Sequence, residues 1–198
     1  VRLGEFEVAP DLAIIAASLD LVPSIIEQLG ARGTRAVIVG PWMWHKMSAS
    51  AIEKARKAIQ EAAKPNLVRV LGPGSGGLVV PAIGLNASAT PVPITPGKIA
   101  LVAQSTALTA AILDRANSKG IGFSTVLHLG SDLDVDLADV LDWLAADPDT
   151  HSILVQFDEV SMKRKFMSTA RSTARNKPMI TIQPSPIRDR NQSSGPFA

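Results

Sequence analysis

Apolar residues along this chain gather into short, mostly continuous runs rather than into alternating patterns. Seven of these runs have the length and the aliphatic content of β-strands. They cover residues 11–17, 35–40, 68–72, 98–104, 124–130, 152–157 and 178–183. Continuous apolar runs are typical of strands that are buried on both faces, as in parallel sheets covered by helices. The pattern therefore predicts parallel sheets.

Segments with a helical period separate these runs. The clearest is residues 51–63, which carry one apolar stripe made of Ile52, Ala55, Ile59 and Ala62. The candidate helix caps are Ser24 with Glu27 (or Asp20 in their place), Ser50 with Glu53, Asp136, and Ser161. Because strands and helices alternate throughout, the predicted class is α/β with two parallel-sheet units.

Residues 72–97 interrupt this alternation. They hold a dense share of the glycine and proline of the chain and show no helical period. We therefore predict an N-terminal domain over residues 1–80, a linker over residues 81–97 and a C-terminal domain over residues 98–198. Because the chain opens on Val1 rather than on methionine, we expect it to be a piece of a longer protein.

The composition of the chain argues against several classes of protein. Aromatic residues make up only 4% of the chain and the net charge is +2, which argues against a surface that stacks or attracts nucleic acid. The absence of cysteine excludes disulfides and thiolate metal sites, and it suits a cytoplasmic location. Since no apolar run approaches the roughly 18–20 residues that span a bilayer, we expect no membrane segment.

The turn at Gln104, Ser105 and Thr106 follows a predicted strand and opens a predicted helix. Free backbone N–H groups and the helix dipole favour an anion at such a place. Ligands of open α/β sheets also bind at the carboxyl ends of the strands. Two interpretations stay open at this point: Ser105 only caps the helix, or the turn binds an anion such as phosphate.

Two further motifs favour structural roles. The glycine-rich residues 72–77 follow a predicted strand, but no helix follows them, so they do not form the dinucleotide-binding fingerprint. The five aspartates of residues 131–142 lack the glycine and the distal glutamate of a helix–loop–helix calcium site. We interpret them as a helix cap and a solvated helix face, and we expect no metal.

The histidines and the basic runs offer no catalytic group. His45, His128 and His151 have neither a metal-ligand partner at i+4 nor a nearby nucleophile. The basic residues in 163–165 and 171–177 belong to one predicted helix, for which a solvated face is the default interpretation. We therefore predict no catalytic residue in this chain.

Residues 84–157 and 164–178 closely resemble a known family, and residues 10–17 and 25–39 extend the likeness. The sequence is similar to the succinyl-CoA-synthetase-like part of ADP-forming acyl-CoA synthetases. Within that group it most resembles the N-terminal region of bacterial protein lysine acetyltransferases, where this region is fused to a GNAT domain. The resemblance implies a partial Rossmann-like CoA-binding domain followed by a flavodoxin-like domain.

The resemblance also implies ligands and partners. It points to CoA or acetyl-CoA as a weakly bound cofactor, and to ATP-grasp and GNAT domains as fused or associated partners, with self-association left open. The residues that it places near CoA are Ala17, Ser18, Val39, Gly40, Gly74 and Ser75. It also makes Gln104, Ser105 and Thr106 the helix start that receives a phosphate or a phosphohistidine.

Several residues depart from the family pattern. Thr106 stands where the family has glycine at the helix start, and Gly74 replaces the asparagine of a Gly-Pro-Asn motif. Asp158 aligns with a glutamate that supports the phosphohistidine, and residues 183–186 lack the family's Lys-Ser-Gly-Arg. The tail after them contains no histidine, although the family's phosphorylated histidine belongs there.

Three functional hypotheses result. The first is a degenerate, regulatory CoA-binding or acyl-CoA-binding region of a protein lysine acetyltransferase, that is, a pseudoenzyme. The second is a fragment of an ADP-forming acyl-CoA synthetase alpha subunit whose histidine lies elsewhere. The third is a scaffold that has no ligand site. Because a phosphoryl shuttle needs a nucleophile that becomes phosphorylated, the missing histidine favours the first hypothesis.

Overall fold

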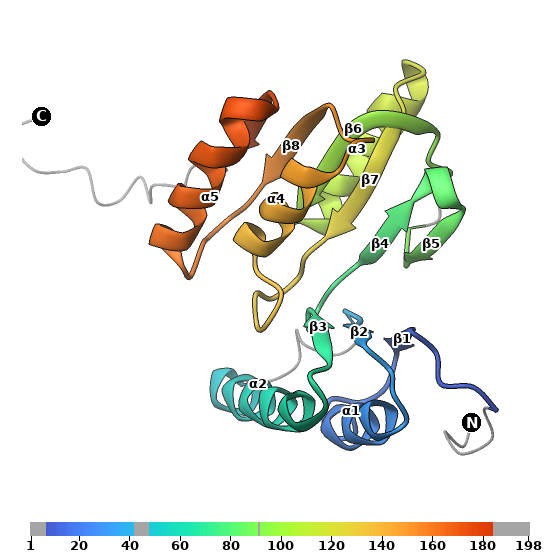
Figure 1. Cartoon of the computed structure of the whole chain (residues 1–198), viewed down its shortest axis with the longest axis vertical. Coiled ribbons are helices and arrows are strands. Elements are labelled where there is room, and N and C mark those ends of the chain that lie inside the picture. The colour runs from blue at the N-terminus through green and yellow to red at the C-terminus, as the bar shows by residue number, and fades with distance from the viewer. Residues whose placement is uncertain (1–6, 42–47, 91, 184–198) are drawn as a thin grey trace, which may run out of the picture.

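The computed structural model describes residues 7–41, 48–90 and 92–183 of the chain. The elements in chain order are β1 (Leu12–Ile15), α1 (Val22–Ala31), β2 (Ala36–Val39), α2 (Ala49–Ala63), the 3-10 helix η3 (Lys64–Asn66), β3 (Arg69–Leu71), β4 (Gly77–Val80), the 3-10 helix η4 (Pro81–Ile83), β5 (Leu85–Ser88), β6 (Pro96–Ala103), α3 (Thr106–Ser118), β7 (Phe123–His128), α4 (Leu137–Ala146), β8 (Ser152–Gln156), α5 (Lys163–Asn176) and β9 (Met179–Ile182). These elements form two lobes, each built around its own sheet (Figure 1).

The N-terminal lobe contains a parallel sheet of three strands in the order β1-β2-β3. Helices α1 and α2 lie side by side under one face of this sheet (Figure 1). That face buries Val37, Val39 and Val70 against the helices. The opposite face turns Ile38 and Leu71 toward the other lobe, where they join its core. The two lobes are therefore joined by apolar contacts.

The C-terminal lobe contains a six-stranded sheet in the order β5-β4-β7-β6-β8-β9. Strands β6 to β9 are parallel, and β4 runs antiparallel to both β7 and β5. Helices α4 and α5 cover one face, while α3 lies on the other (Figure 1). This arrangement confirms the predicted α/β class with parallel sheets.

All seven predicted strands are present, but the β4–β5 hairpin was not predicted. It lies in the segment rich in glycine and proline, so residues 81–97, expected to be a linker, contain η4, β5 and the first residues of β6. The two short strands were missed because glycine and proline are common both in hairpin turns and in linkers. Gly84, with φ +68°, ends η4 and lets the chain reverse. The division of the chain into domains stays a prediction.

Helix starts were predicted with mixed success. Asp136 caps α4 and forms a capping box with Asp139, as expected. The other three expected caps were wrong: α1 starts after Leu21 without a side-chain cap, α2 is capped by Ser48, and α5 starts after Met162. In α1, Pro23 occupies the first turn, where its missing N–H costs nothing, so no polar cap is needed to mark the start.

The connection between β7 and α4 returns to the N-terminal lobe. Asp132 forms a parallel bridge with Gly72. The N–H of Val135 donates to the carbonyl of Val70 (3.2 Å), and the N–H of Val70 donates to the Asp134 carboxylate (2.7 Å). The segment thus lies beside β3 and ties the connection after β7 to the N-terminal lobe.

Candidate functional site

The turn between β6 and α3 is fixed by one buried side chain. The Oε1 atom of Gln156, at the end of β8, accepts hydrogen bonds from the N–H of Gln104 (3.1 Å) and the N–H of Ser105 (2.7 Å). Its Nε2 atom donates to Asp158 (2.9 Å). Gln156 has 0% exposure, so water cannot replace these partners. The turn is therefore held in one conformation before any ligand arrives.

Helix α3 leaves two backbone donors free at its start. Ser105 caps the helix, as predicted, because its hydroxyl oxygen accepts from the N–H of Leu108 (3.3 Å). The N–H groups of Thr106 and Ala107 have no hydrogen-bond partner among the described residues. Free N–H groups at the positive end of a helix attract anions. The cap and the anion site are thus compatible rather than alternative.

His128 lies beside this helix start, at the carboxyl end of β7. The N–H of Gly76 donates to Nδ1 of the ring (2.7 Å), which makes Nδ1 the acceptor nitrogen and leaves the proton on Nε2. Nε2 is 2.9 Å from the hydroxyl oxygen of Thr106 and donates to it. The hydroxyl hydrogen of Thr106 is then free to point outward as a donor.

Burial lowers the pKa of His128 below its ordinary value, although carbonyl groups of His128 itself and of Gln104 oppose the shift. A histidine whose pKa is depressed on folding takes up protons more readily in the unfolded chain. We therefore expect the free energy of unfolding to fall as the pH drops through about 6.5, by at most about 1.4 kcal/mol per pH unit from this group.

Denaturant titrations at several pH values between 5 and 8 test this expectation. A His128→Gln variant removes the titrating group and should show a shallower fall of the unfolding free energy with acidification. His151, which is exposed, serves as the matched control in a His151→Gln variant. Equal slopes for the His128→Gln variant and the unsubstituted chain would contradict the assignment.

The loop after β3 reaches the same histidine. The hydroxyl of Ser75 donates to the carbonyl of His128 (2.5 Å) and accepts from the N–H of Gly77 (2.9 Å). Ser75 itself is only 1% exposed. Gly74, with φ +79°, faces open space, since nothing lies within 4 Å of the position that a Cβ would take. The loop is thus anchored through Ser75 and open at Gly74.

The residues predicted near CoA all lie at the carboxyl ends of β1, β2 and β3. The N–H of Ser75 donates to the carbonyl of Val39 (3.1 Å), and the N–H of Gly74 donates to that of Gly40 (3.3 Å). Ala17 and Ser18 follow β1, and Ser18 is exposed. The structure therefore brings Val39 and Gly40 next to Gly74 and Ser75. The side chains of Val39 and Ser75 are buried and support the loop from within.

Gln104 and Asp158 serve the turn rather than an open site. The side chain of Gln104 donates to the carbonyl of Glu159 (3.1 Å) and accepts from the N–H of Asp158 (2.8 Å). Sequence reasoning missed Gln156 altogether and gave His128 no role. The available signal was a polar residue inside an otherwise apolar run that ends beside a turn.

The acidic segment before and within α4 pairs with cations. Asp134 and Asp139 accept from Arg69 at 3.0 and 3.3 Å, and Lys165 reaches both Asp136 and Asp139. Burial would lower the pKa of Arg69, but the two carboxylates raise it above its ordinary value. No group of histidine and acidic residues able to hold a metal occurs in the part of the chain that the structure describes.

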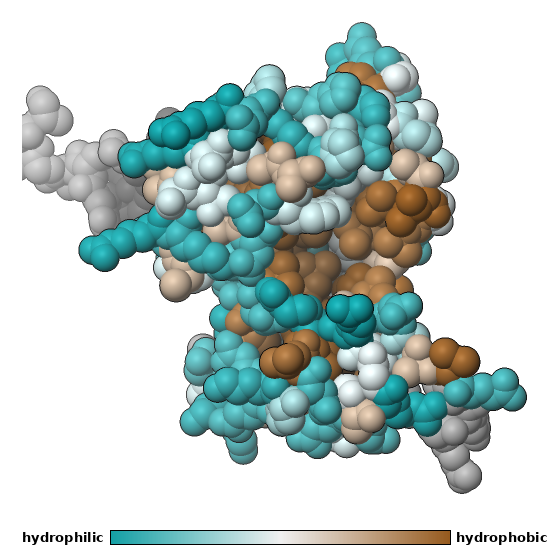
Figure 2. Space-filling view, in the orientation of Figure 1, coloured by the Kyte–Doolittle hydropathy of each residue, from teal (hydrophilic) through white to brown (hydrophobic). Residues whose placement is uncertain are grey.

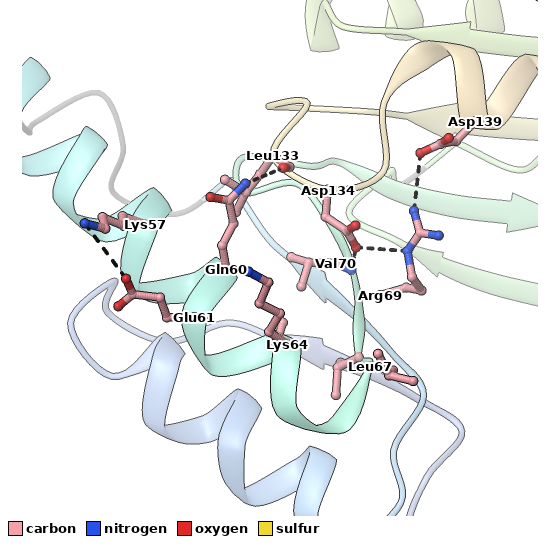
Figure 3. A pocket seen from close by; sticks show the side chains of 12 residues that line it. Lys57, Gln60, Glu61, Lys64, Leu67, Arg69, Val70, Leu133, Asp134 and Asp139 are labelled. Carbon is pink, nitrogen blue, oxygen red and sulfur yellow. Dashed lines mark hydrogen bonds and ion pairs between the residues drawn. The ribbon is translucent and has the colours of Figure 1, made fainter. Parts of the chain in front are cut away.

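A separate cleft of about 700 Å³ lies where α2 and η3 face the acidic segment (Figure 3). The side chain of Gln60 crosses it to donate to the carbonyl of Leu133 (2.9 Å), and Arg69 crosses it to Asp134. None of the residues predicted to bind CoA or phosphate lines this cleft. Its contacts join the two lobes, so we interpret it as part of the scaffold.

Over the described ranges, no helix combines the length and the apolar character required to cross a bilayer.

Comparisons with known proteins agree with this architecture. Residues 96–193 match the family described as succinyl-CoA ligase-like flavodoxin domain. The chain is 31% identical, over 87% of its length, to the alpha subunit of acetate–CoA ligase [ADP-forming] I from Pyrococcus furiosus. It is 32% identical, over the same share, to acetate–CoA ligase [ADP-forming] I from Archaeoglobus fulgidus. The chain spans 37% and 25% of these two relatives, respectively.

Solved structures give the same result. The crystal structure of PH0766 from Pyrococcus horikoshii OT3 superposes with a TM-score of 0.86 at 26% identity, over 93% of this chain and 42% of that one. The dinucleotide-forming acetyl-coenzyme A synthetase 1 of Candidatus Korarchaeum cryptofilum, in complex with phosphate and ADP, superposes with a TM-score of 0.83 at 26% identity, over 91% of this chain and 39% of that one. Residues 96–193 therefore belong to the succinyl-CoA ligase-like flavodoxin domain family, and the chain is homologous to the alpha subunits of ADP-forming acetate–CoA ligases.

Proposed function

We propose that this chain is part of an ADP-forming acyl-CoA ligase, in which it binds CoA and a phosphate group where its two sheets meet. One observation supports the proposal above all others. The loop of Gly74 and Ser75 and the start of α3 come from different lobes, yet both are fixed to His128. A thioester and a phosphate held by these two features would lie next to each other.

The residues near the N-terminal sheet fit CoA in part. Ser18 is exposed at the end of β1, and the open space at Gly74 lets a ligand approach the backbone closely. Val39 and Ser75 cannot touch a ligand with their side chains, because both are buried. In this proposal Ala17, Ser18 and Gly74 contact CoA, while Val39, Gly40 and Ser75 hold the loop. When bound, CoA supplies the thiol that accepts the acyl group.

The start of α3 provides the anion site. The free N–H groups of Thr106 and Ala107 and the outward hydroxyl hydrogen of Thr106 form a fixed set of donors. Such preorganised donors stabilise negative charge without the cost of reorienting solvent. Thr106, which departs from the glycine of the family, therefore adds a donor rather than blocking the site.

His128 cannot carry the phosphate itself. Its Nδ1 accepts from Gly76, its Nε2 donates to Thr106, and the ring is buried, so neither nitrogen is available as a nucleophile. Among the other histidines, His151 lies before β8, next to Asp149, and His45 lies outside the described residues. We therefore assign any phosphorylated histidine to another part of the protein.

The acetyltransferase interpretation is the second candidate. The departures from the ligase pattern at Asp158 and at residues 183–186, together with the missing phosphorylated histidine, favour it. The relatives reported above are named as CoA ligases or synthetases, and this favours the ligase. The relation to GNAT fusions stays a prediction.

Titration calorimetry with CoA, and separately with inorganic phosphate, tests the proposal. We expect both to bind, CoA with micromolar or weaker affinity. A Thr106→Val variant should bind phosphate about tenfold or more weakly, because it loses a hydrogen bond to a charged group. Thr106→Ser keeps the hydroxyl and is the matched control. Failure of both ligands to bind would overturn the proposal.

The full-length protein separates the two candidates. A ligase should form ADP when ATP, acetate and CoA are supplied together. Acetyl transfer to lysine without ADP formation would instead support the regulatory interpretation.

A further inference from the structure

Helix α5 displays three arginines on one side. Arg164, Arg171 and Arg175 are seven and four residues apart, which places them within an arc of about 40° on a helix that turns by about 100° per residue. The buried residues of the helix, Phe166 and Ala170, lie on the opposite side. We call Arg164, Arg171 and Arg175 the arginine face. It is exposed and lies opposite the buried residues; the surface over α5 is strongly hydrophilic in Figure 2.

Two other cations of this segment, Lys165 and Lys177, have partners within the fold, whereas Lys163 is exposed beside the arginines. Lys165 pairs with Asp136 and Asp139, and Lys177 donates to the carbonyl of Leu144 (2.6 Å). The three arginines are exposed and form no ion pair with any carboxylate of the described residues. Helix α5 itself contains no aspartate or glutamate that could compensate them. The fold therefore uses two of its cations and leaves the arginine face without a partner.

This arrangement costs the helix local stability. Arg164 stands in the first turn, where the positive end of the helix dipole disfavours a cation. Arg171 and Arg175 repel each other at a spacing of four residues. Met162 supplies no side-chain hydrogen bond as a cap. Positions that break local rules without a gain in packing are expected to serve a function, and an anionic partner would offset the two costs that arise from charge.

Neighbouring residues indicate what kind of anion binds. Met167, which is 46% exposed, lies beside the arginines. Arginine and methionine are enriched in protein interfaces, and arginine pairs with carboxylates through two parallel hydrogen bonds. No aromatic side chain is exposed on α5 for stacking with bases.

We infer that the arginine face of α5 docks an acidic surface of a partner protein. An open hollow of about 550 Å³ between the arginine side chains, bordered by the hydroxyls of Ser168 and Ser172, gives room for carboxylates. This inference concerns a different surface from the α3 site, so either can fail alone.

The probe is a fluorescent helical peptide with three glutamates spaced four and seven residues apart on one side, which matches the arginine face in the antiparallel direction. Fluorescence anisotropy with the full chain should show this peptide binding at least tenfold more tightly than an isomer with the same glutamates spread around the helix. The triple variant Arg164→Glu, Arg171→Glu and Arg175→Glu should lose at least tenfold in affinity. Circular dichroism should show that it folds, since the gain from a glutamate in the first turn offsets the loss from one in the last turn.

The matched control reverses three exposed cations elsewhere, Arg35, Lys54 and Lys119, and thus changes the net charge equally. It should bind the matched peptide within twofold of the unsubstituted chain. Equal affinities for the two peptides, or equal losses of affinity in the two triple variants, would show that binding depends only on net charge and would overturn the inference. Tighter binding of a 20-nucleotide RNA than of the matched peptide, or no peptide binding at all, would also overturn it.

Discussion

Replacing Gln156 with leucine is expected to lower the free energy of unfolding by about 1–3 kcal/mol. The variant keeps the approximate volume of the side chain but removes Oε1, the acceptor for the N–H groups of Gln104 and Ser105. Leaving a buried donor without a partner costs about 1–3 kcal/mol for each group. The N–H of Gln104 keeps a second acceptor, the carbonyl of Gln156 at 3.2 Å, so the loss should fall mainly on Ser105.

Urea titration measures the change, and amide hydrogen exchange localises it. The N–H of Ser105 should exchange faster in the variant. The exchange rates of amides in the centre of β6 should change only as far as the global stability changes. The matched control is Gln28→Leu, the same substitution on the exposed side of α1, for which a change within about 0.5 kcal/mol is expected. A Gln156→Leu variant as stable as that control would refute the role of Gln156.

Alanine at Gly130 should destabilise the protein by about 2–4 kcal/mol and disturb the candidate site. Gly130 has φ +68°, a backbone conformation that costs a residue with a Cβ about 1 kcal/mol. The added Cβ would also lie 2.5 Å from the N atom of Ser75 and 2.6 Å from the carbonyl carbon of Gly74. Because both neighbours are backbone atoms, the loop must move, at a further cost of about 1–3 kcal/mol.

A Gly120→Ala variant separates the cost of the backbone conformation from the cost of the clash. Its φ of +66° is almost the same as that of Gly130, but nothing lies within 4 Å of the position of its Cβ. Gly120→Ala should therefore cost only about 1 kcal/mol and leave CoA binding unchanged. The difference between the two variants in thermal or urea denaturation reports the clash alone. If both variants lose the same stability, the loop is not packed against β7 as the structure shows.

Both substitutions act on the geometry that the proposed function needs. Gln156 fixes the start of α3, and Gly130 allows the loop of Gly74 and Ser75 to approach the end of β7. Neither residue contacts a ligand in the proposal. Changes in phosphate or CoA binding in these variants would therefore arise from displaced donors, and they should accompany the loss of stability.

Seven strands and the α/β class could be predicted from the sequence because a continuous apolar run is a local signal. The turn at residues 104–106 was found for the same reason, since a strand, a polar break and a helical period are adjacent in the chain. Strands β4 and β5 escaped prediction because their pairing, not their composition, makes them strands: Leu78 lies opposite Ala87 on one side and Leu127 on the other. An edge hairpin joined to a parallel sheet depends on contacts that no short window contains.

The candidate site likewise has parts that the sequence shows and parts that only the folded structure shows. By itself, the sequence determined seven of the strands, the capped start of α3 and the glycine-rich loop after β3. Only the tertiary structure decided that Gly76 and Thr106 fix the two nitrogens of His128, and that Gln156 supplies the acceptor for the turn. These partners are 52, 22 and 51 residues apart in the sequence. Hydrogen bonds act over about 3 Å, so their partners become known only once the folded strands place them side by side.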